Sequence, residues 1–201
     1  MKLKILASCF LITILIMDCS SVPEIHYYLL DNPLENPDFN QQPKHDKILG
    51  VQLFDIAPLY DQDKIVYRES FYEAKFYNYH RWIAPPDEMI TAETIDHITN
   101  SSLFKNVIQY PSTLNVDYIL KGNILAFEEW DQENQWFSHI RLMVELFDMR
   151  GKNTLWKEII EVKNPVAEKQ PLELVKSINQ SFKECMEKVI YQIDLSISAN
   201  Y

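Results

Sequence analysis

Apolar and polar residues alternate along several stretches of the chain, which is typical of strands with one buried face. The two longest stretches are residues 116–129 and 135–149, and the polar residues 130–134 between them predict a hairpin. A third apolar stretch, residues 154–162, follows a turn at 150–153 and completes an antiparallel meander. Shorter strands are predicted at residues 26–30, 47–56, 65–68, 72–77 and 104–110.

Within residues 135–149, the residue types differ between the two faces that a strand would present. One face carries a tryptophan, a serine and four aliphatic residues, and we expect it to lie in the core: Trp136, Ser138, Ile140, Leu142, Val144 and Leu146. The other face mixes aromatic, charged and apolar residues, and we expect it to be half solvated: Phe137, His139, Arg141, Met143, Glu145 and Phe147.

Two segments have the apolar spacing of helices. The first opens with Pro85-Pro86-Asp87-Glu88, where proline suits the first turn and the acids complement the helix dipole, and it should end near residues 100–102. Its expected apolar face is Met89, Ala92, Ile95, Ile98 and Thr99. The second begins at Pro171, and its apolar face is Val175, Ile178, Phe182, Cys185, Met186, Val189 and Ile193. The pattern therefore predicts an α+β fold, an antiparallel-rich sheet packed by two helices in a single compact domain.

The first two dozen residues have the pattern of a secretory signal. Lys2 and Lys4 precede an apolar run over residues 5–17, and a polar segment follows it. The run is shorter than the roughly 20 residues that span a bilayer, so we expect it to be removed rather than kept as a transmembrane helix. Cys19 at its end predicts cleavage just before this residue and attachment of lipid to its thiol, as in bacterial lipoproteins.

The residues around Cys19 leave alternatives open. A lipoprotein signal usually has a small residue before the cysteine, whereas Asp18 stands here. Residues 6–9, Leu-Ala-Ser-Cys, match better but leave no apolar core ahead of them. A plain signal peptide, or an uncleaved one acting as a weak anchor, is the alternative. Ser20 is not the aspartate that retains lipoproteins at the inner membrane, so we expect outer-membrane attachment. The predicted organisation is a signal peptide at 1–18, a lipid-anchored segment and linker at 19–46, and the domain at 47–201.

Charge and cysteine content narrow the classes of partner. The net charge of -10 argues against nucleic acid as a partner and against a polybasic membrane-binding surface. Once Cys9 is removed and Cys19 is acylated, only Cys185 stays free, and its place on an apolar helix face predicts a buried structural thiol. A disulfide within the mature monomer is therefore excluded.

The sequence offers little that points to catalysis. The five histidines have no metal-type spacing with one another or with cysteine, and three glycines cannot form a phosphate loop. We expect no cofactor beyond the covalent acyl or diacylglycerol lipid on Cys19. A run of acidic residues lies at the predicted hairpin tip, and we expect it to be a solvated loop rather than an acid–base pair: Glu128, Glu129, Asp131 and Glu133.

Aromatic residues supply the candidate binding sites. Trp130 and Trp136 flank the hairpin tip, where they either dock on a partner or form a cross-strand pair that stabilises the hairpin. Tyrosine, tryptophan and arginine are the residue types that dominate protein interfaces. All three types occur close together within residues 72–86. For Tyr79-His80-Arg81 the alternatives are an interface and structural hydrogen bonding; for Trp82 they are an interface and a corner of the core.

One array of residues resembles a known family. It reads Phe54-x-x-Ala57-Pro58-x-Tyr60, then Ile65-Val66-Tyr67-Arg68, then Tyr72-Glu73 and Phe76-Tyr77-x-Tyr79-His80-Arg81-Trp82-x-x-Pro85-Pro86. This array resembles the ABC-type transport auxiliary lipoproteins, the PqiC-like partners of MCE-domain systems. The segments Tyr27-Tyr28-Leu29-Leu30 and residues 117–124 resemble the first and central strands of that family.

The resemblance implies an auxiliary component of a transport system rather than an enzyme. Such lipoproteins sit on the periplasmic face of the outer membrane and engage an MCE-domain protein of an ABC transport system, which moves lipid or other apolar molecules across the envelope. Some members form rings, so a homo-oligomer is implied here too. The alternative is a periplasmic lipid carrier or sensor with an apolar cavity between sheet and long helix. The candidate partner-binding residues are Tyr67, Arg68, Tyr79, His80, Arg81, Trp82, Trp130 and Trp136.

Overall fold

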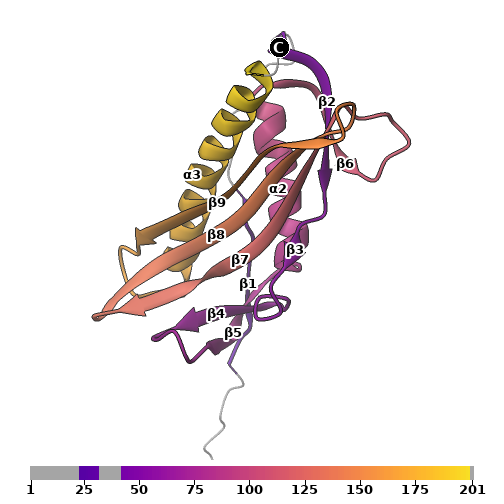
Figure 1. The fold of residues 1–201 in the computed structure, drawn as a ribbon. Coiled ribbons are helices and arrows are strands. Elements are labelled where there is room, and N and C mark those ends of the chain that lie inside the picture. Colours follow the sequence, from indigo (N-terminus) through magenta and orange to yellow (C-terminus); the bar gives the residue numbers. More distant parts are fainter. Residues whose placement is uncertain (1–22, 32–41, 200–201) are drawn as a thin grey trace, which may run out of the picture.

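The computed structural model describes residues 23–31 and 42–199, and within them two helices cover one face of a large mixed sheet (Figure 1). The signal peptide, Cys19 and most of the expected linker lie outside the described residues. The helices are α2 (Pro86–Asn100) and α3 (Pro171–Ser198). The strands are β1 (His26–Tyr28), β2 (His45–Gln52), β3 (Asp55–Ile56), β4 (Lys64–Arg68), β5 (Lys75–Trp82), β6 (Phe104–Tyr110), β7 (Tyr118–Gln132), β8 (Gln135–Asp148) and β9 (Asn153–Pro165).

Strand β7 organises the sheet. On one side it pairs antiparallel with β8, which pairs antiparallel with β9, so the predicted meander is confirmed. On its other side β7 pairs in parallel with three successive strands, β2, β3 and β4. Strand β6 extends the sheet beyond β2, and β5 followed by β1 extends it beyond β4. The antiparallel part was predicted from the sequence, whereas the parallel pairings were not.

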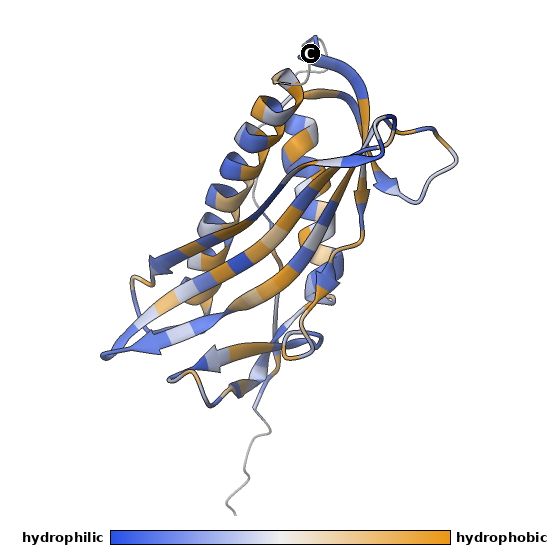
Figure 2. Cartoon of the chain, in the orientation of Figure 1, coloured by the Kyte–Doolittle hydropathy of each residue, from blue (hydrophilic) through white to orange (hydrophobic). Residues whose placement is uncertain are grey.

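The alternation along β8 produces the core as expected. Ser138, Ile140, Leu142, Val144 and Leu146 are fully buried, and Trp136 is half-buried beside them. The opposite face of β8 is only partly covered, apart from a buried histidine. Figure 2 shows the resulting change between hydrophobic and hydrophilic positions along β7 and β8.

A close approach to the backbone fixes one position of β7. The ring of Phe54 lies against Gly122, where a Cβ atom would come within 2.2 Å of the ring carbons. The backbone N–H of Phe54 in turn donates a hydrogen bond to the Thr91 hydroxyl on α2, at 3.0 Å. Gly122 therefore allows the segment after β2 to pack between the sheet and α2.

Helix α3 buries the face that its sequence predicts. Val175, Ile178, Phe182, Cys185, Met186, Val189 and Ile193 all lie in the core, and Cys185 is a buried free thiol. Burial raises the pKa of this thiol to about 12, so the thiol stays protonated and inert.

Helix α2 buries a different face from the one predicted. Met89 and Ile98 are buried as expected, but Ala92 and Thr99 are exposed, and Ile90 and Thr94 take their place. The Thr94 hydroxyl donates to the Ile90 carbonyl oxygen at 2.7 Å, so this threonine can be buried without an unmet hydrogen bond. The prediction was wrong because it followed steps of three residues throughout, whereas a helix with 3.6 residues per turn returns to one face by steps of three and four, as in Met89, Ile90, Thr94 and Ile98.

Several strand boundaries also differ from those predicted. Strand β5 covers residues 75–82 rather than 72–77, and β7 continues to Gln132, so the turn of the long hairpin is only Glu133-Asn134. Both turn residues have positive φ, 51° and 63°, as a tight two-residue hairpin turn requires. Strand β2 begins at His45, inside the segment expected to be linker. Within the described residues, no helix is long and apolar enough to span a membrane.

Candidate partner-binding site

The candidate residues gather at the end of the sheet where the β4–β5 hairpin lies beside the tip of β7 and β8 (Figure 1). Two hollows open there. The first, here called the acidic hollow, has a volume of about 430 Å³ and is lined by Tyr67, Glu69, Phe76, Tyr77, Asn78, Tyr79, His80, Glu129, Asp131 and Trp136. The second, here called the mixed hollow, has a volume of about 580 Å³ and is lined by Arg68, Glu69, Ser70, Phe71, Tyr72, Trp130, Asp131, Gln132, His139, Arg141, Glu161 and Lys163.

Two consecutive acidic residues of β7 separate the hollows. Glu128 and Glu129 are 0% and 1% exposed, and successive side chains of a strand point to opposite faces of the sheet. The expectation of a solvated acidic loop was therefore wrong for both residues. It holds for Glu133, which is exposed in the turn, while Asp131 is half-buried.

Glu128 is the centre of a complete hydrogen-bond network beside the mixed hollow. Its carboxylate accepts hydrogen bonds from the Tyr60 hydroxyl at 2.6 Å and from the Arg68 guanidinium, whose Nε lies 2.7 Å away. The Nδ1 atom of His139 lies 2.9 Å from the same carboxylate, and Nε2 lies 2.8 Å from Glu161. Burial alone would raise the pKa of the Glu128 carboxyl, but the bonds from His139, Arg68 and Tyr60 hold it below its ordinary value.

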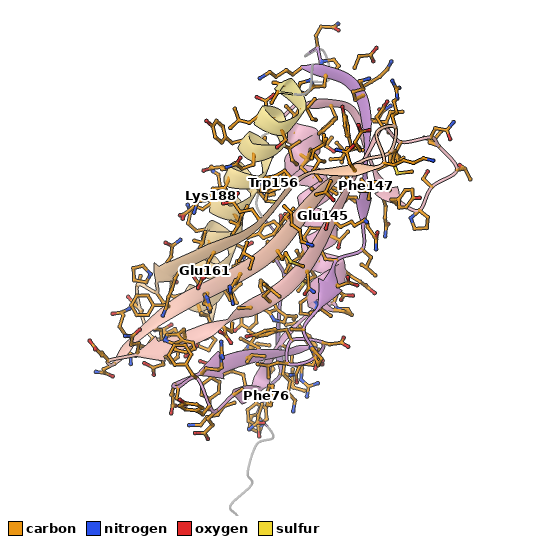
Figure 3. The ribbon with its side chains drawn as sticks, in the orientation of Figure 1. Phe76, Glu145, Phe147, Trp156, Glu161 and Lys188 are labelled. Atoms are coloured by element: carbon orange, nitrogen blue, oxygen red, sulfur yellow. The ribbon has the colours of Figure 1, made fainter. Side chains whose placement is uncertain are left out.

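Trp130 forms the inner wall of the mixed hollow. The Arg68 guanidinium and the Lys163 ammonium each lie 4.8 Å from its ring centroid, and the Phe71 ring lies 4.9 Å away. Trp130 is consequently only 7% exposed, although it lies next to the hairpin tip. Glu161 on β9, labelled in Figure 3, also lines this hollow.

Glu129 is the most buried residue of the acidic hollow. The Tyr77 hydroxyl donates a hydrogen bond to it at 2.7 Å, and the Tyr77 ring contacts Tyr67 at 5.0 Å and Trp136 at 6.4 Å between centroids. Burial raises the pKa of Glu129 to about 7; nearby Asp131 acts in the same direction, while the Tyr77 hydroxyl and Lys169 oppose it. Glu129 therefore changes its charge near neutral pH.

Strand β5 carries the remaining candidates in different environments. His80 stacks on His26 of β1, with 5.2 Å between centroids, and its Nδ1 lies 3.0 Å from the Tyr28 hydroxyl. Arg81 donates to Asp63 at 2.7 Å and lines neither hollow. Trp82 is 2% exposed and packs on Phe127, so of its two alternatives the structure shows the core position.

Six of the eight candidates thus line a hollow. Tyr67, Tyr79, His80 and Trp136 line the acidic hollow, and Arg68 and Trp130 line the mixed one. Sequence reasoning missed the buried acids between them. The one available signal was Trp130, an aromatic residue that follows Glu128 and Glu129 and so continues the strand beyond them, ahead of the turn.

Exposed apolar side chains are concentrated at the same end of the molecule. Of the fourteen large apolar side chains that are exposed within the described residues, eight come from β1, β5 and the segments next to them. Tyr72 is 99% exposed and Phe71 79%, and Phe76 lies at the outer end of β5 (Figure 3). We call this set the apolar rim: Ile25, Tyr27, Leu29, Phe71, Tyr72, Phe76, Tyr79 and Ile83. Exposed apolar side chains that gather at one end of a molecule in this way are typical of interaction sites.

No group of three or more His, Cys, Asp or Glu residues within residues 23–31 and 42–199 could hold a metal ion. The arrangement instead offers aromatic walls, one buried acid that lacks a cationic partner, and a surrounding apolar surface. These are features of a surface that recognises another molecule.

The comparisons with known proteins agree with this fold. A family model described as ABC-type transport auxiliary lipoprotein component matches residues 28–189. The crystal structure of protein XCC0632 from Xanthomonas campestris is 15% identical, with a TM-score of 0.73, and the match covers 90% of this chain and 98% of that one. The hypothetical protein CT253 from Chlamydia trachomatis is 9% identical, with a TM-score of 0.52 and coverages of 77% and 99%. No protein of curated function matches the sequence.

Proposed function

Because the chain belongs to the family of ABC-type transport auxiliary lipoprotein components, we propose that it is a lipid-anchored docking component of such a transport system. In this proposal, lipid on Cys19 holds the domain on the periplasmic face of the outer membrane. The domain then binds an MCE-domain protein that works with an ABC transporter to move lipid or other apolar molecules across the envelope. The proposal assigns no chemical reaction to the chain.

The observation that carries the docking role is the apolar rim. Phe71 and Tyr72 of this rim line the mixed hollow, and Phe76 and Tyr79 line the acidic one. Tyrosine and phenylalanine are enriched at protein interfaces. Exposed apolar area of this kind is stabilised when a partner covers it, at about 25 cal/mol for each Å² removed from water. The candidate residues and the exposed surface thus support one docking end.

The position of the anchor fits the same end. Cys19 precedes β1 by seven residues, so it lies at most about 25 Å along the chain from β1. Strand β1 pairs in parallel with β5, with His26 opposite His80. The chain from the anchor therefore enters the domain beside the acidic hollow, and a partner bound there would be close to the membrane that holds the lipid.

The experiment is co-purification of the full lipoprotein from detergent-solubilised membranes, with the captured proteins identified by mass spectrometry. We expect an MCE-domain protein to be recovered, and its recovery to fall at least about tenfold when Tyr72 and Tyr79 of the rim are both replaced by serine. Tyr191→Ser is the matched control, because Tyr191 is an exposed tyrosine on α3 away from this end. Equal recovery from all three proteins, or recovery of no MCE-domain protein, would refute the docking role.

The alternative function, a lipid carrier or sensor, depends on an internal cavity. The lipid carrier would need a cavity between the sheet and α3, but there the side chains of both form one buried cluster, so no observation favours it.

The homo-oligomeric ring that the family resemblance implies stays part of the proposal. Strands β1 and β9 each pair with only one neighbour within the described residues, so their outer edges are open to a second copy.

A further inference from the structure

We propose that the acidic hollow receives the side chain of a lysine or arginine that the partner protein presents. The identity of that protein rests on the proposed function, whereas the preference of the hollow for a cation follows from its own residues. No contact of this kind is needed for the apolar rim to dock, so the two ideas can fail separately.

Glu128 and Glu129 differ in how their buried carboxylates are compensated. Both carboxylates are buried, and Glu128 is neutralised by Arg68 and satisfied by three side chains. Glu129 accepts one hydrogen bond, from Tyr77 to Oε2; within the described residues its other oxygen, Oε1, accepts none. A buried carboxylate is costly unless a cation and hydrogen bonds compensate it. Glu129 thus lacks the cation that its neighbour has.

The walls of the acidic hollow suit a cationic group. The rings of Tyr67, Tyr77 and Trp136 line it, and aromatic faces attract ammonium and guanidinium groups. Two lysines already use the same rings, since Lys75 lies 5.9 Å from the Tyr67 centroid and Lys169 lies 5.9 Å from that of Trp136. A third cation could therefore combine ring contacts with a bond to Glu129.

The charges around the hollow leave Glu129 as the acid without a cationic partner. Glu69 pairs with Lys75 at 2.8 Å, and Asp131 lies 3.9 Å from the Lys169 ammonium. Neither lysine forms an ion pair with Glu129. An arriving ammonium or guanidinium would consequently meet one carboxylate that has no ion pair within the described residues, at the most buried point of the hollow.

The composition of the lining favours a protein side chain over a lipid headgroup. A phosphoethanolamine headgroup carries a phosphate as well as an amine, and phosphate binding calls for arginine or lysine. No arginine or lysine is among the residues that line the acidic hollow. The nearby Lys75 and Lys169 already have acidic partners in Glu69 and Asp131. A long lysine or arginine side chain from a docked protein brings a cation without an attached anion.

The test uses the full mature lipoprotein in detergent and small probes measured by saturation-transfer NMR. N-acetyl-arginine amide should bind at least about tenfold more tightly than N-acetyl-citrulline amide, which has the same shape without the charge. Glu129→Gln, which keeps an oxygen for the Tyr77 hydroxyl, should abolish that preference. Glu187→Gln is the matched control and should leave the preference unchanged, because Glu187 is exposed on α3 and lines neither hollow.

A measurement on the unaltered protein covers the case in which Glu129→Gln fails to fold. Affinity for the arginine probe should rise about tenfold between pH 6 and pH 8, because Glu129 ionises with a pKa of about 7. The other charged groups around it are Glu69, Asp131 and Lys169. His80 also lines the hollow, but burial lowers its pKa from the ordinary value, which moves its titration away from that of Glu129.

Three results would overturn the inference: equal binding of the arginine and citrulline probes, an unchanged preference in a folded Glu129→Gln variant, or an affinity that does not change with pH. Tighter binding of phosphoethanolamine than of the arginine probe would assign the hollow to a lipid headgroup instead. If the arginine probe binds as expected but no MCE-domain protein co-purifies, the proposed function fails and the cation site stands. The reverse result would refute the cation site and leave the docking role in place.

Discussion

Arg68 on β4 and Glu128 on β7 form a two-bonded ion pair across neighbouring parallel strands, and Glu128 is fully buried. The pair joins the β4–β5 hairpin to the centre of the sheet. Without it, the hairpin that carries much of the apolar rim would be held to β7 by few backbone pairs, since only Val66, Tyr67 and Arg68 register with β7.

Arg68→Met should destabilise the domain strongly. It leaves the Glu128 carboxylate buried without its cation, which typically costs about 3–5 kcal/mol. Urea unfolding measures the change, and the double variant Arg68→Met with Glu128→Met should recover part of it. Arg141→Met is the control, because Arg141 and Glu161 are both exposed and 3.6 Å apart, so its cost should stay below about 1 kcal/mol. A loss in Arg68→Met no larger than in this control would contradict the argument.

Glu129 should make the domain less stable as pH rises. Its pKa is raised to about 7 in the folded state, so between its ordinary pKa of 4.5 and 7 the folded protein binds more protons than the unfolded one. Its contribution to stability is therefore present at pH 4.5 and lost by pH 8, an effect of a few kcal/mol. In urea unfolding at several pH values, Glu129→Gln should reduce this decline and be the more stable protein at pH 8. An unchanged slope would show that another group causes it.

Cys19→Ala should release the protein from the membrane. Each CH₂ group of an acyl chain that enters the bilayer contributes about 0.8 kcal/mol to membrane binding, so two or three chains hold a protein almost permanently. Without them, we expect the variant in the aqueous envelope fraction. Labelling with a radioactive fatty acid should mark the unaltered protein and not the variant. Cys9→Ala separates the two candidate cysteines, because it should keep the label; loss of label in Cys9→Ala alone would move the anchor to that residue.

Gly122→Ala should destabilise the domain by about 1–3 kcal/mol, because the added methyl group would overlap the Phe54 ring. In a domain of this size, that corresponds to a fall in Tm of several degrees. Combining the change with Phe54→Leu removes most of the ring and should restore part of the loss. A Gly122→Ala variant with an unchanged Tm would show that the ring can move aside freely.

The sequence predicted those parts of the fold whose signal is local. The alternation along β8 and the apolar stripe of α3 each depend on one segment burying one face, so both were correct. The three parallel partners of β7 could not be predicted, because nothing within a segment specifies which distant strand it joins. The burial of Glu128 has the same origin: Tyr60, Arg68 and His139 make it possible, and they come from three other segments.

For the candidate site, too, the sequence indicates residue types but not where their side chains lie. Aromatic crowding indicated Tyr79 and Trp136, which line the acidic hollow, but the same reasoning included Trp82, which is buried in the core. Residue type indicates that a side chain is suited to an interface. Only its position relative to the sheet decides whether it faces solvent, and for Trp82 that position depends on Phe127, which lies 45 residues further along the chain.

The central position of β7 has a consequence for how the protein is made. Strands β2, β3 and β4 pair with a segment that follows them by some 60 to 70 residues, as in Leu49 opposite Tyr118 and Val66 opposite Glu128. Such distant pairing slows folding, because the entropy of closing a long loop is lost before the stabilising contacts between the strands form. The first half of this chain cannot complete its sheet until β7, in the second half, has been made. The chain can therefore pass through an export channel while it is still unfolded.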